Sequence, residues 1–184
     1  MTNKILVFVG MPGSGKSEAV LYLSKIGIPH VRFGQLTDDT LRERGLPQTV
    51  ENEKVVREEM RQKFGMAAYA TLAKPKIEAL LAGHTTIAID GLYSWEEYLL
   101  LKKDFPALIL IHIFSEPKVR YERLSKRAIR PVPLADCYLR DVAEIENLNK
   151  GGPIAIADFV IDNSEENRGQ LHREIDTLLK SITT

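Results

Sequence analysis

One stretch near the start of the chain decides the fold: KILVFVGMPGSGKS, residues 4–17. Its first six residues are a nearly continuous apolar run, which is typical of a strand buried on both faces. The next eight match the pattern Gly, four residues, Gly, Lys and then Ser or Thr. Glycines at these positions let the backbone wrap around an anion with its N–H groups pointing inward. The stretch therefore predicts a strand, a phosphate-binding loop and a helix, in that order.

Each polar group of this loop has an expected task. The amides continue into the first turn of the following helix, where the helix dipole also favours an anion. Lys16 is expected to reach the β- and γ-phosphates of a nucleotide, and Ser17 to bind Mg²⁺. Glycine makes up only about 7% of residues, so the full pattern arises by chance in well under about one chain in a hundred. The expected cofactors are ATP and Mg²⁺, and the nucleotide-binding residues are Gly10, Pro12, Gly13, Ser14, Gly15, Lys16 and Ser17.

Apolar runs alternate with helix-like segments along the rest of the chain. Such alternation predicts an α/β sandwich of three layers, with a mostly parallel sheet and right-handed crossovers. In such sheets ligands bind at the carboxyl ends of the strands. The expected strands cover residues 4–9, 29–34, 85–89, 107–114 and 158–161.

Helix boundaries are marked less evenly. Ser94 and Glu97 have the spacing of a capping box at the start of a helix. Residues 50–81 have a helical composition, in which Gly65 and Pro75 are expected to break or kink the helix.

Bulk properties narrow the class of protein. A length of 184 residues fits one domain, taken as residues 1–184, and the 25 acidic and 25 basic residues leave no net charge. That balance argues against a nucleic-acid partner. No apolar run is long enough to span a membrane, and the single Cys137 excludes an intrachain disulfide. We expect a cytoplasmic protein without membrane contact. A monomer and a homodimer both remain open.

The loop alone does not decide the reaction, because GTPase switches, motors and kinases all use it. The guanine-reading motif Asn-Lys-x-Asp is absent; Asn149-Lys150-Gly151-Gly152 only begins like one. This favours a kinase, although a preference for ATP over GTP does not follow. The chain is also too compact for the extra domains of most motors.

At this point the order of several motifs becomes informative. The sequence resembles the small-molecule kinases grouped with adenylate kinase and dephospho-CoA kinase, and it is most similar to the adenylate-kinase-related, dephospho-CoA-kinase-like branch. The resemblance implies a five-stranded parallel core, an acceptor-binding helical region at about 35–82 and a short mobile lid at about 125–140. It rests on residues 10–17, Asp90-Gly91, Arg123 with Arg127, Arg140-Asp141, and residues 157–163.

Arginines are concentrated in the second half of the chain. Arg120, Arg123, Arg127 and Arg130 are spaced so that most of them fall on one helical face. Arg140 follows after a break containing two prolines. Arginines on a segment that closes are what phosphoryl transfer needs, because the charge on the migrating group must be met by donors that exclude water. Arg123, Arg127 and Arg140 are therefore the catalytic candidates. The alternative is a solvated basic helix face.

Two further polar residues follow predicted strands. Asp90 ends a strand expected beside the strand of the phosphate loop. There it can hold Mg²⁺ through water or accept the proton of an attacking hydroxyl, whereas the alternative is a simple turn before Gly91. The resemblance implies that Asp162-Asn163 borders the adenine pocket, and Asn163 is taken as a nucleotide-binding residue. A turn is the alternative there too.

The acceptor end departs from the pattern of the related kinases. Those acting on nucleoside monophosphates usually carry an Arg four residues after the Gly that matches Gly34, and here that residue is Asp38. They also carry an Arg after the Asp-Gly of the third strand, and Leu92-Tyr93-Ser94 holds none. Two arginine clamps for an acceptor phosphate are thus missing. Only Arg offers that planar fork, so the loss is not conservative.

Three explanations stay open. The first is that Arg32, Arg42 or Arg57 supplies the clamp from a neighbouring position. A second is an acceptor that presents a hydroxyl there, with Asp38, Asp39 or Asp90 as base and with Tyr93 and Trp95 stacked on a ring. The third is a chain that binds nucleotide but has lost kinase activity.

The sequence therefore favours a kinase that transfers the γ-phosphoryl group of ATP to a nucleoside monophosphate, a nucleoside or dephospho-CoA. The alternative is a nucleotide-binding switch or slow NTPase that acts through a protein partner.

Overall fold

The computed structural model describes residues 3–165 and 167–183. Within these residues the chain forms a five-stranded sheet, and every pairing in it is parallel. The strand order β2-β3-β1-β4-β5 places the strand of the phosphate loop at the centre. The strands are β1 (Lys4–Val9), β2 (His30–Arg32), β3 (Thr86–Asp90), β4 (Leu108–Phe114) and β5 (Phe159–Asp162). All five expected strands are confirmed, with ends that differ by a residue or two.

Helices follow the strands along the chain. The capping box predicted at Ser94 is present, since its side chain accepts from the amide of Glu97 while the Glu97 carboxylate accepts from the Ser94 amide. The helices are α1 (Lys16–Lys25), α2 (Gly34–Glu43), α3 (Val50–Phe64), α4 (Ala68–Gly83), α5 (Trp95–Asp104), α6 (Pro117–Ser125), α7 (Leu134–Glu146), α8 (Gly151–Ala155) and α9 (Arg168–Thr183).

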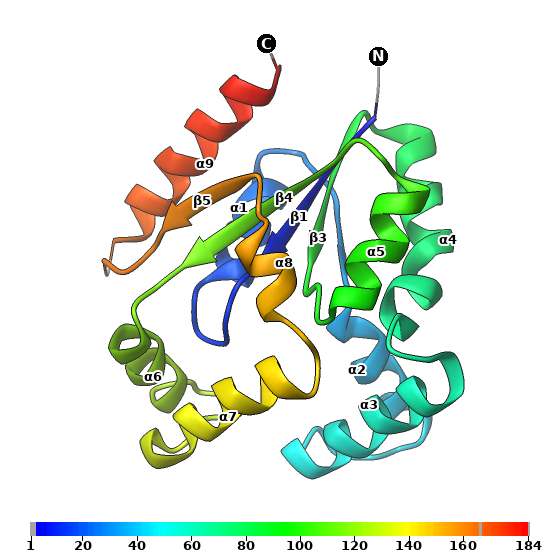
Figure 1. Cartoon of the computed structure of the whole chain (residues 1–184), viewed down its shortest axis with the longest axis vertical. Coiled ribbons are helices and arrows are strands. Elements are labelled where there is room, and N and C mark those ends of the chain that lie inside the picture. Colours follow the sequence, from blue (N-terminus) through cyan, green and yellow to red (C-terminus); the bar gives the residue numbers. More distant parts are fainter. Residues whose placement is uncertain (1–2, 166, 184) are drawn as a thin grey trace.

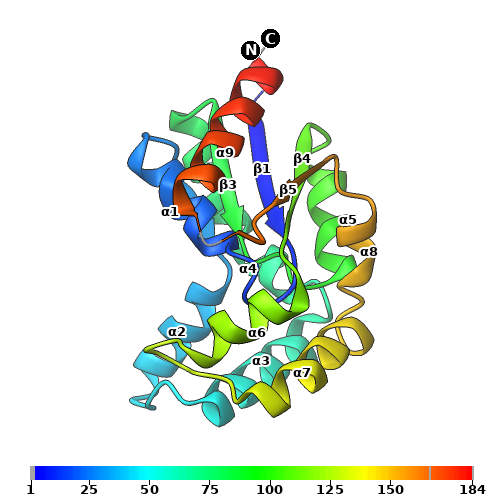
Figure 2. The same cartoon turned by 90° about the vertical axis from the view of Figure 1, so that its left-hand side faces the viewer.

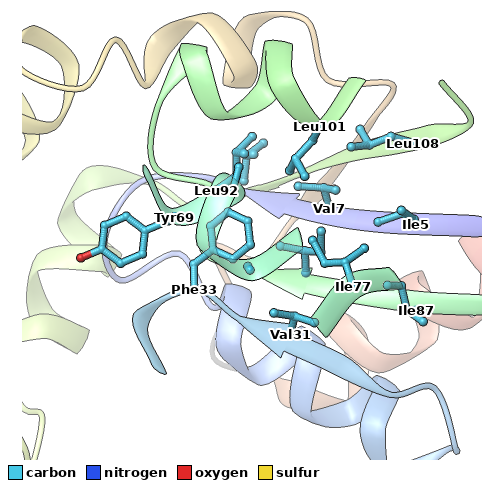
Figure 3. Close-up of a cluster of buried hydrophobic side chains, with 14 of the residues drawn as sticks. Ile5, Val7, Val31, Phe33, Tyr69, Ile77, Ile87, Leu92, Leu101 and Leu108 are labelled. Carbon is cyan, nitrogen blue, oxygen red and sulfur yellow. The ribbon is translucent and has the colours of Figure 1, made fainter. Parts of the chain in front are cut away.

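Both faces of the sheet are buried, which explains why the strands are continuously apolar. Alternate residues of β1 point to opposite faces. Ile5 and Val7 pack with α4 and α5 in the cluster drawn in Figure 3, and Leu6 and Phe8 pack against α1 and α9. Figure 2 shows the sheet between α1 and α9 on one side and α5 and α8 on the other. Full burial of each such side chain contributes roughly 1.5–3 kcal/mol.

The parallel register aligns the carboxyl ends of the strands. Phe8 pairs with Asp90, and Val9 pairs with His112. Helices α2, α3, α6 and α7 all lie beyond these ends, whereas β1 begins and α9 ends at the opposite end of the molecule (Figures 1 and 2). The helices beyond the sheet include much of the expected acceptor region and lid.

Two expectations about helix continuity need correction. Gly65 does end α3, but Pro75 lies inside α4 and does not end it. Helix α6 ends at Ser125, so Arg127 and Arg130 do not share a helical face with Arg120. The prolines at 131 and 133 exclude the residues before them from a helix. The shared arginine face that the spacing predicted is therefore wrong beyond Ser125.

Candidate functional site

The phosphate loop leaves β1 and enters α1 as predicted. Gly15 adopts a left-handed conformation, φ 103°, and a Cβ there would collide with the side-chain amide of Asn163. Only glycine adopts this backbone without strain and leaves room for that neighbour. The Lys16 ammonium donates to the carbonyls of Gly10 (2.8 Å) and Met11 (3.1 Å), which lie at the start of the loop. Lys16 is thus held within the loop that it serves.

The electrostatic surroundings of Lys16 favour the binding of an anion. The pKa of its ammonium is lowered from 10.5 to about 7, chiefly by burial and then by the positive charge of Lys150, against the opposing effects of Asp90 and Glu144. A buried ammonium with too little negative charge around it gains free energy when an anion binds. Phosphate oxygens are such an anion, so the loop has the charge as well as the shape for a nucleotide.

The expected metal ligands meet in space. The Ser17 hydroxyl donates to Oδ2 of Asp90 at 2.9 Å, although 73 positions separate them in the chain. Asp90 ends β3 and is buried, which places its carboxylate directly beside the start of α1. A hydroxyl and a carboxylate are the hard oxygen ligands that suit Mg²⁺, which usually keeps several waters and takes phosphate oxygens as well. The residues present therefore fit a magnesium ion.

Arg120 supports the phosphate loop through hydrogen bonds inside the protein. Its guanidinium is buried and makes two hydrogen bonds with Asp141 of α7, at 3.0 and 2.6 Å. It also donates to the carbonyls of Ser115 and Pro12, both at 3.1 Å. These bonds engage its donors with protein groups and tie α6, α7 and the phosphate loop together. Arg120 is a structural residue of the loop.

Arg123 and Asn163 connect the loop after β5 to the same region. Arg123 donates to the Ser115 hydroxyl (2.9 Å) and to the carbonyls of Asn163 (2.8 Å) and Glu165 (2.9 Å). Asn163 in turn donates to the carbonyl of Ser14 in the phosphate loop at 2.8 Å. Asn163 thus lies against the phosphate loop, and Arg123 holds the backbone of that segment.

The other two catalytic candidates lie in the predicted lid. Arg127 follows the end of α6 and is exposed, and Arg140 lies on α7. Desolvation by neighbouring groups and the positive charges of Arg140 and Arg130 lower the pKa of Arg127. Cations held near one another in this way attract a multivalent anion. The charges of Arg130 and Arg140 thus act on Arg127, while Arg123 contacts the loop after β5.

All three arginines offered as substitutes at the acceptor end are paired with carboxylates. Arg32 pairs with Asp38, which is the residue that replaces the expected arginine. Arg42 pairs with Asp39 at 2.5 Å and Arg57 with Glu53 at 3.2 Å. Arg130 crosses from the lid to Glu53 at 2.6 Å and Asp38 at 3.8 Å. The acceptor end is thus a network of ion pairs between α2, α3 and the lid segment.

Tyr93 and Trp95 are packed among protein groups. The Tyr93 ring meets the Tyr69 ring edge-on at 5.4 Å, and burial raises the pKa of the Tyr93 hydroxyl. Trp95 tilts against Tyr98 at 5.3 Å and covers Gly152 of α8. Both aromatic rings are thus engaged in packing contacts within the protein.

Sequence reasoning missed one pair at this site, Lys150 and Glu144. Lys150 is 3% exposed and pairs with Glu144, and its ammonium lies 5.6 Å from the centre of the Tyr93 ring. A lysine between Asn149 and Gly151 carries no local signal of burial. Only the packing of α8 against α5, with Lys150 over the Tyr93 ring, reveals it.

Two hollows elsewhere on the surface are weaker candidates for a nucleotide site. They have volumes of about 430 and 520 Å³ and lie beside Leu108, at the amino end of β4 and so opposite the phosphate loop. They lack the paired hydroxyl and carboxylate that the loop end contains. Among the described residues, no helix is both long and apolar enough to cross a membrane.

Comparison with known proteins places this geometry in a family. A family model described as an AAA domain matches residues 6–133. A UPF0200 protein of Thermococcus sibiricus is 38% identical over 182 residues, which cover 97% of this chain and 95% of that one. The chain belongs to the UPF0200 family.

Solved structures similar to this UPF0200 chain include small-molecule kinases. A shikimate kinase from Bacteroides thetaiotaomicron has a TM-score of 0.62 at 14% identity, with 99% of both chains covered. A gluconokinase from Sinorhizobium meliloti has a TM-score of 0.56 at 17% identity, with 98% of this chain and 95% of that one covered. At these identities the likeness is one of fold. The P-loop α/β fold is confirmed as kinase-like, and the finer resemblance to adenylate kinase and dephospho-CoA kinase stays a prediction.

Proposed function

We propose that this protein is an ATP-dependent kinase that transfers the γ-phosphoryl group to a nucleotide- or nucleoside-type small molecule. The observation that carries the proposal is the hydrogen bond from Ser17 to Asp90, 2.9 Å long, beside the partly buried ammonium of Lys16. These three groups supply what a triphosphate with Mg²⁺ requires: two hard oxygen ligands and a cation, next to a ring of amides. The kinase-like fold supports the same reading.

The chemistry assigns a task to each of these residues. Lys16 and the loop amides would hold the β- and γ-phosphates, and Ser17 and Asp90 would hold Mg²⁺, which would supply positive charge beside the phosphate oxygens. An acceptor oxygen attacks the γ-phosphorus, the bond to the β,γ-bridging oxygen breaks, and ADP leaves. Asp90 can take the proton of an attacking hydroxyl. Arg127 and Arg140 are proposed to close over the transferred group, and Arg123 to hold the adenine-side segment.

Transfer from γ-labelled ATP with Mg²⁺ tests the proposal. The acceptor panel contains nucleoside monophosphates, nucleosides and dephospho-CoA, with shikimate and gluconate added because similar folds act on them. We expect one labelled product in the wild type and a loss of about 10²- to 10³-fold or more in Lys16→Ala, because a positioned donor is removed from the transferring group. A circular dichroism spectrum and a melting temperature establish that the variant is folded.

Two results would contradict the kinase. One is labelled product that persists unchanged in Lys16→Ala. The other is ATP hydrolysis in the wild type at the same rate with and without every acceptor, which is the behaviour of a switch or slow NTPase that acts through a partner.

A further inference from the structure

Lys150 is buried in a part of the molecule where burial of a cation is costly. Its side chain is 3% exposed, and Glu144 is its ion-pair partner. Taking a Lys–Glu pair out of water costs about as much free energy as the pair regains, and an apolar pair of similar size is often as stable. Stability alone therefore gives little reason for an ion pair at this position.

The fold holds Lys150 firmly where it is. Asn149, directly before it, has a left-handed backbone with φ 51°, and α8 begins directly after it. Trp95 of α5 covers Gly152, which anchors the start of α8 to the segment that follows β3. The Lys150 ammonium consequently lies over the Tyr93 ring, 5.6 Å from its centre.

Tyr93 shows which part of the site Lys150 faces. A Cβ atom on Gly91 would lie 2.9 Å from the Tyr93 hydroxyl oxygen, and one on Gly34 would lie 3.1 Å from it. Gly91 follows the metal-ligand candidate Asp90, and Gly34 is the first residue of α2. Lys150 thus lies above the junction between the end of β3 and the start of the acceptor helices, where an acceptor must approach the γ-phosphate.

Cations from several segments of the chain meet around Glu144. Burial raises the pKa of the Glu144 carboxyl, but the charge and hydrogen bond of Lys150 and the charges of Lys16 and Arg140 together bring it below its ordinary value. Asp90 also acts on Lys16, and Lys150 acts on Glu97, whose own pKa is raised to about 7, chiefly by burial. At the other side of the acceptor end Arg42 pairs with Asp39, and Glu53 is shared by Arg57 and Arg130.

We propose that Lys150, held in place by Glu144, binds an anionic group of the phosphoryl acceptor, a phosphate or a carboxylate. This inference rests on the proposed kinase function and narrows its substrates to anionic ones. An ammonium is a compact point charge that can bind either a phosphate or a carboxylate. The guanidinium groups of the missing arginines, by contrast, select for a partner that binds through two oxygens. Lys150 thereby takes the place of the absent clamps. Glu144 is a positioning residue.

The test compares Lys150→Met with wild type in two measurements. In the transfer assay we expect the acceptor KM to rise about 10- to 100-fold, since a charged hydrogen bond contributes about 1.5–3 kcal/mol. The Kd for ATP should change much less than the acceptor KM, and Lys150→Arg should recover part of the loss by keeping the charge. Lys74→Met, which removes a lysine paired with Asp104 on the α4–α5 side, is the matched control.

Stability needs a separate safeguard, because Lys150→Met leaves Glu144 buried without its partner. The double variant Lys150→Met/Glu144→Gln removes both charges and should fold like the wild type. It should show the same rise in acceptor KM. An unchanged acceptor KM in the folded double variant overturns the proposal, as does a wild type that phosphorylates neutral nucleosides as well as the anionic acceptors. Phosphorylated and carboxylated members of the panel distinguish the two kinds of anion.

A binding measurement keeps the inference separate from the kinase itself. With the loop filled by a non-hydrolysable ATP analogue and Mg²⁺, inorganic phosphate or acetate should raise the melting temperature of the wild type but not of the double variant. If no acceptor is labelled but this difference is present, the proposed function fails and the anion site stands. If neither anion raises the melting temperature of the wild type, or if the wild type and the double variant respond equally, the proposed anion site is refuted.

Discussion

The two ends of the transfer reaction are built in different ways in this molecule. The donor end consists of one continuous loop, residues 10–17, whose polar groups contact one another and Asp90. The acceptor end consists of ion pairs between separate elements, such as Arg130 of the lid segment with Glu53 of α3 and Arg32 of β2 with Asp38 of α2. Phosphate geometry is the same in every nucleotide, whereas acceptors differ. A donor site can therefore stay a fixed motif, while an acceptor site must be assembled for its own ligand.

The largest expected effect comes from the buried pair behind the donor loop. Arg120→Met should lower the free energy of unfolding by about 3–5 kcal/mol, because it leaves Asp141 buried without its partner. Denaturation with urea measures it. Arg120→Met/Asp141→Leu is the control and should recover most of the stability, yet bind ATP more weakly, since the contact to the Pro12 carbonyl is also lost. A change below about 1 kcal/mol in the single variant contradicts the structural role of Arg120.

The next effect concerns the metal ligands of the donor end. Asp90→Asn keeps the size of the side chain and can still accept from Ser17, but it removes the negative charge. We expect Mg²⁺-dependent transfer to fall by about 10- to 100-fold, as for groups that orient a bound metal. Titration of the rate with Mg²⁺ should show a higher half-saturation point. Equal Mg²⁺ dependence in both proteins would remove Asp90 from the metal site.

An arginine–aspartate pair at the acceptor end supplies the matched contrast to Arg120. The Arg42 side chain is 74% exposed and pairs with Asp39. Arg42→Gln should change the free energy of unfolding by less than about 1 kcal/mol, because water screens exposed pairs. The same urea titration measures this change. If Arg42→Gln destabilises as strongly as Arg120→Met, the difference between the two ends does not lie in burial.

The smallest expected effect is the uptake of a proton when ATP binds. The pKa of Lys16 is lowered to about 7, and phosphates that bind the loop should raise it towards its ordinary value of 10.5. Below pH 7 the ammonium is already formed, so binding takes up no proton through it. Between about pH 7 and 10, ATP binding should take up a proton, and affinity should fall as pH rises. Calorimetry in two buffers of different ionisation enthalpy measures this uptake, which should vanish in Lys16→Met.

Local patterns predicted the elements well. The five strands, the capping box at Ser94 and the end of α3 at Gly65 all follow from the properties of neighbouring residues. The contact of Ser17 with Asp90 was also predictable, since parallel strands that are neighbours bring their carboxyl ends together. The roles of Arg123, Arg127 and Arg140 in catalysis remain predictions.

Spacing failed where the backbone left the helix. The regular intervals among the arginines predicted one face, but α6 ends at Ser125, and Arg127 and Arg130 lie beyond it. Arg120, on the same helix, is turned inward to Asp141. Side-chain spacing carries information only as long as the helix continues, and the prolines at 131 and 133 act against that continuation.

The donor loop, the strands and the parallel sheet follow from local patterns, because apolar runs, glycines and caps act over a few residues. The partner of each charge depends instead on how the helices pack: Asp38 meets Arg32, Arg120 faces Asp141, and Lys150 is buried over Tyr93. The free energy of a charge depends on its burial and on neighbours from distant parts of the chain. Those neighbours exist only once the helices have packed around the end of the sheet.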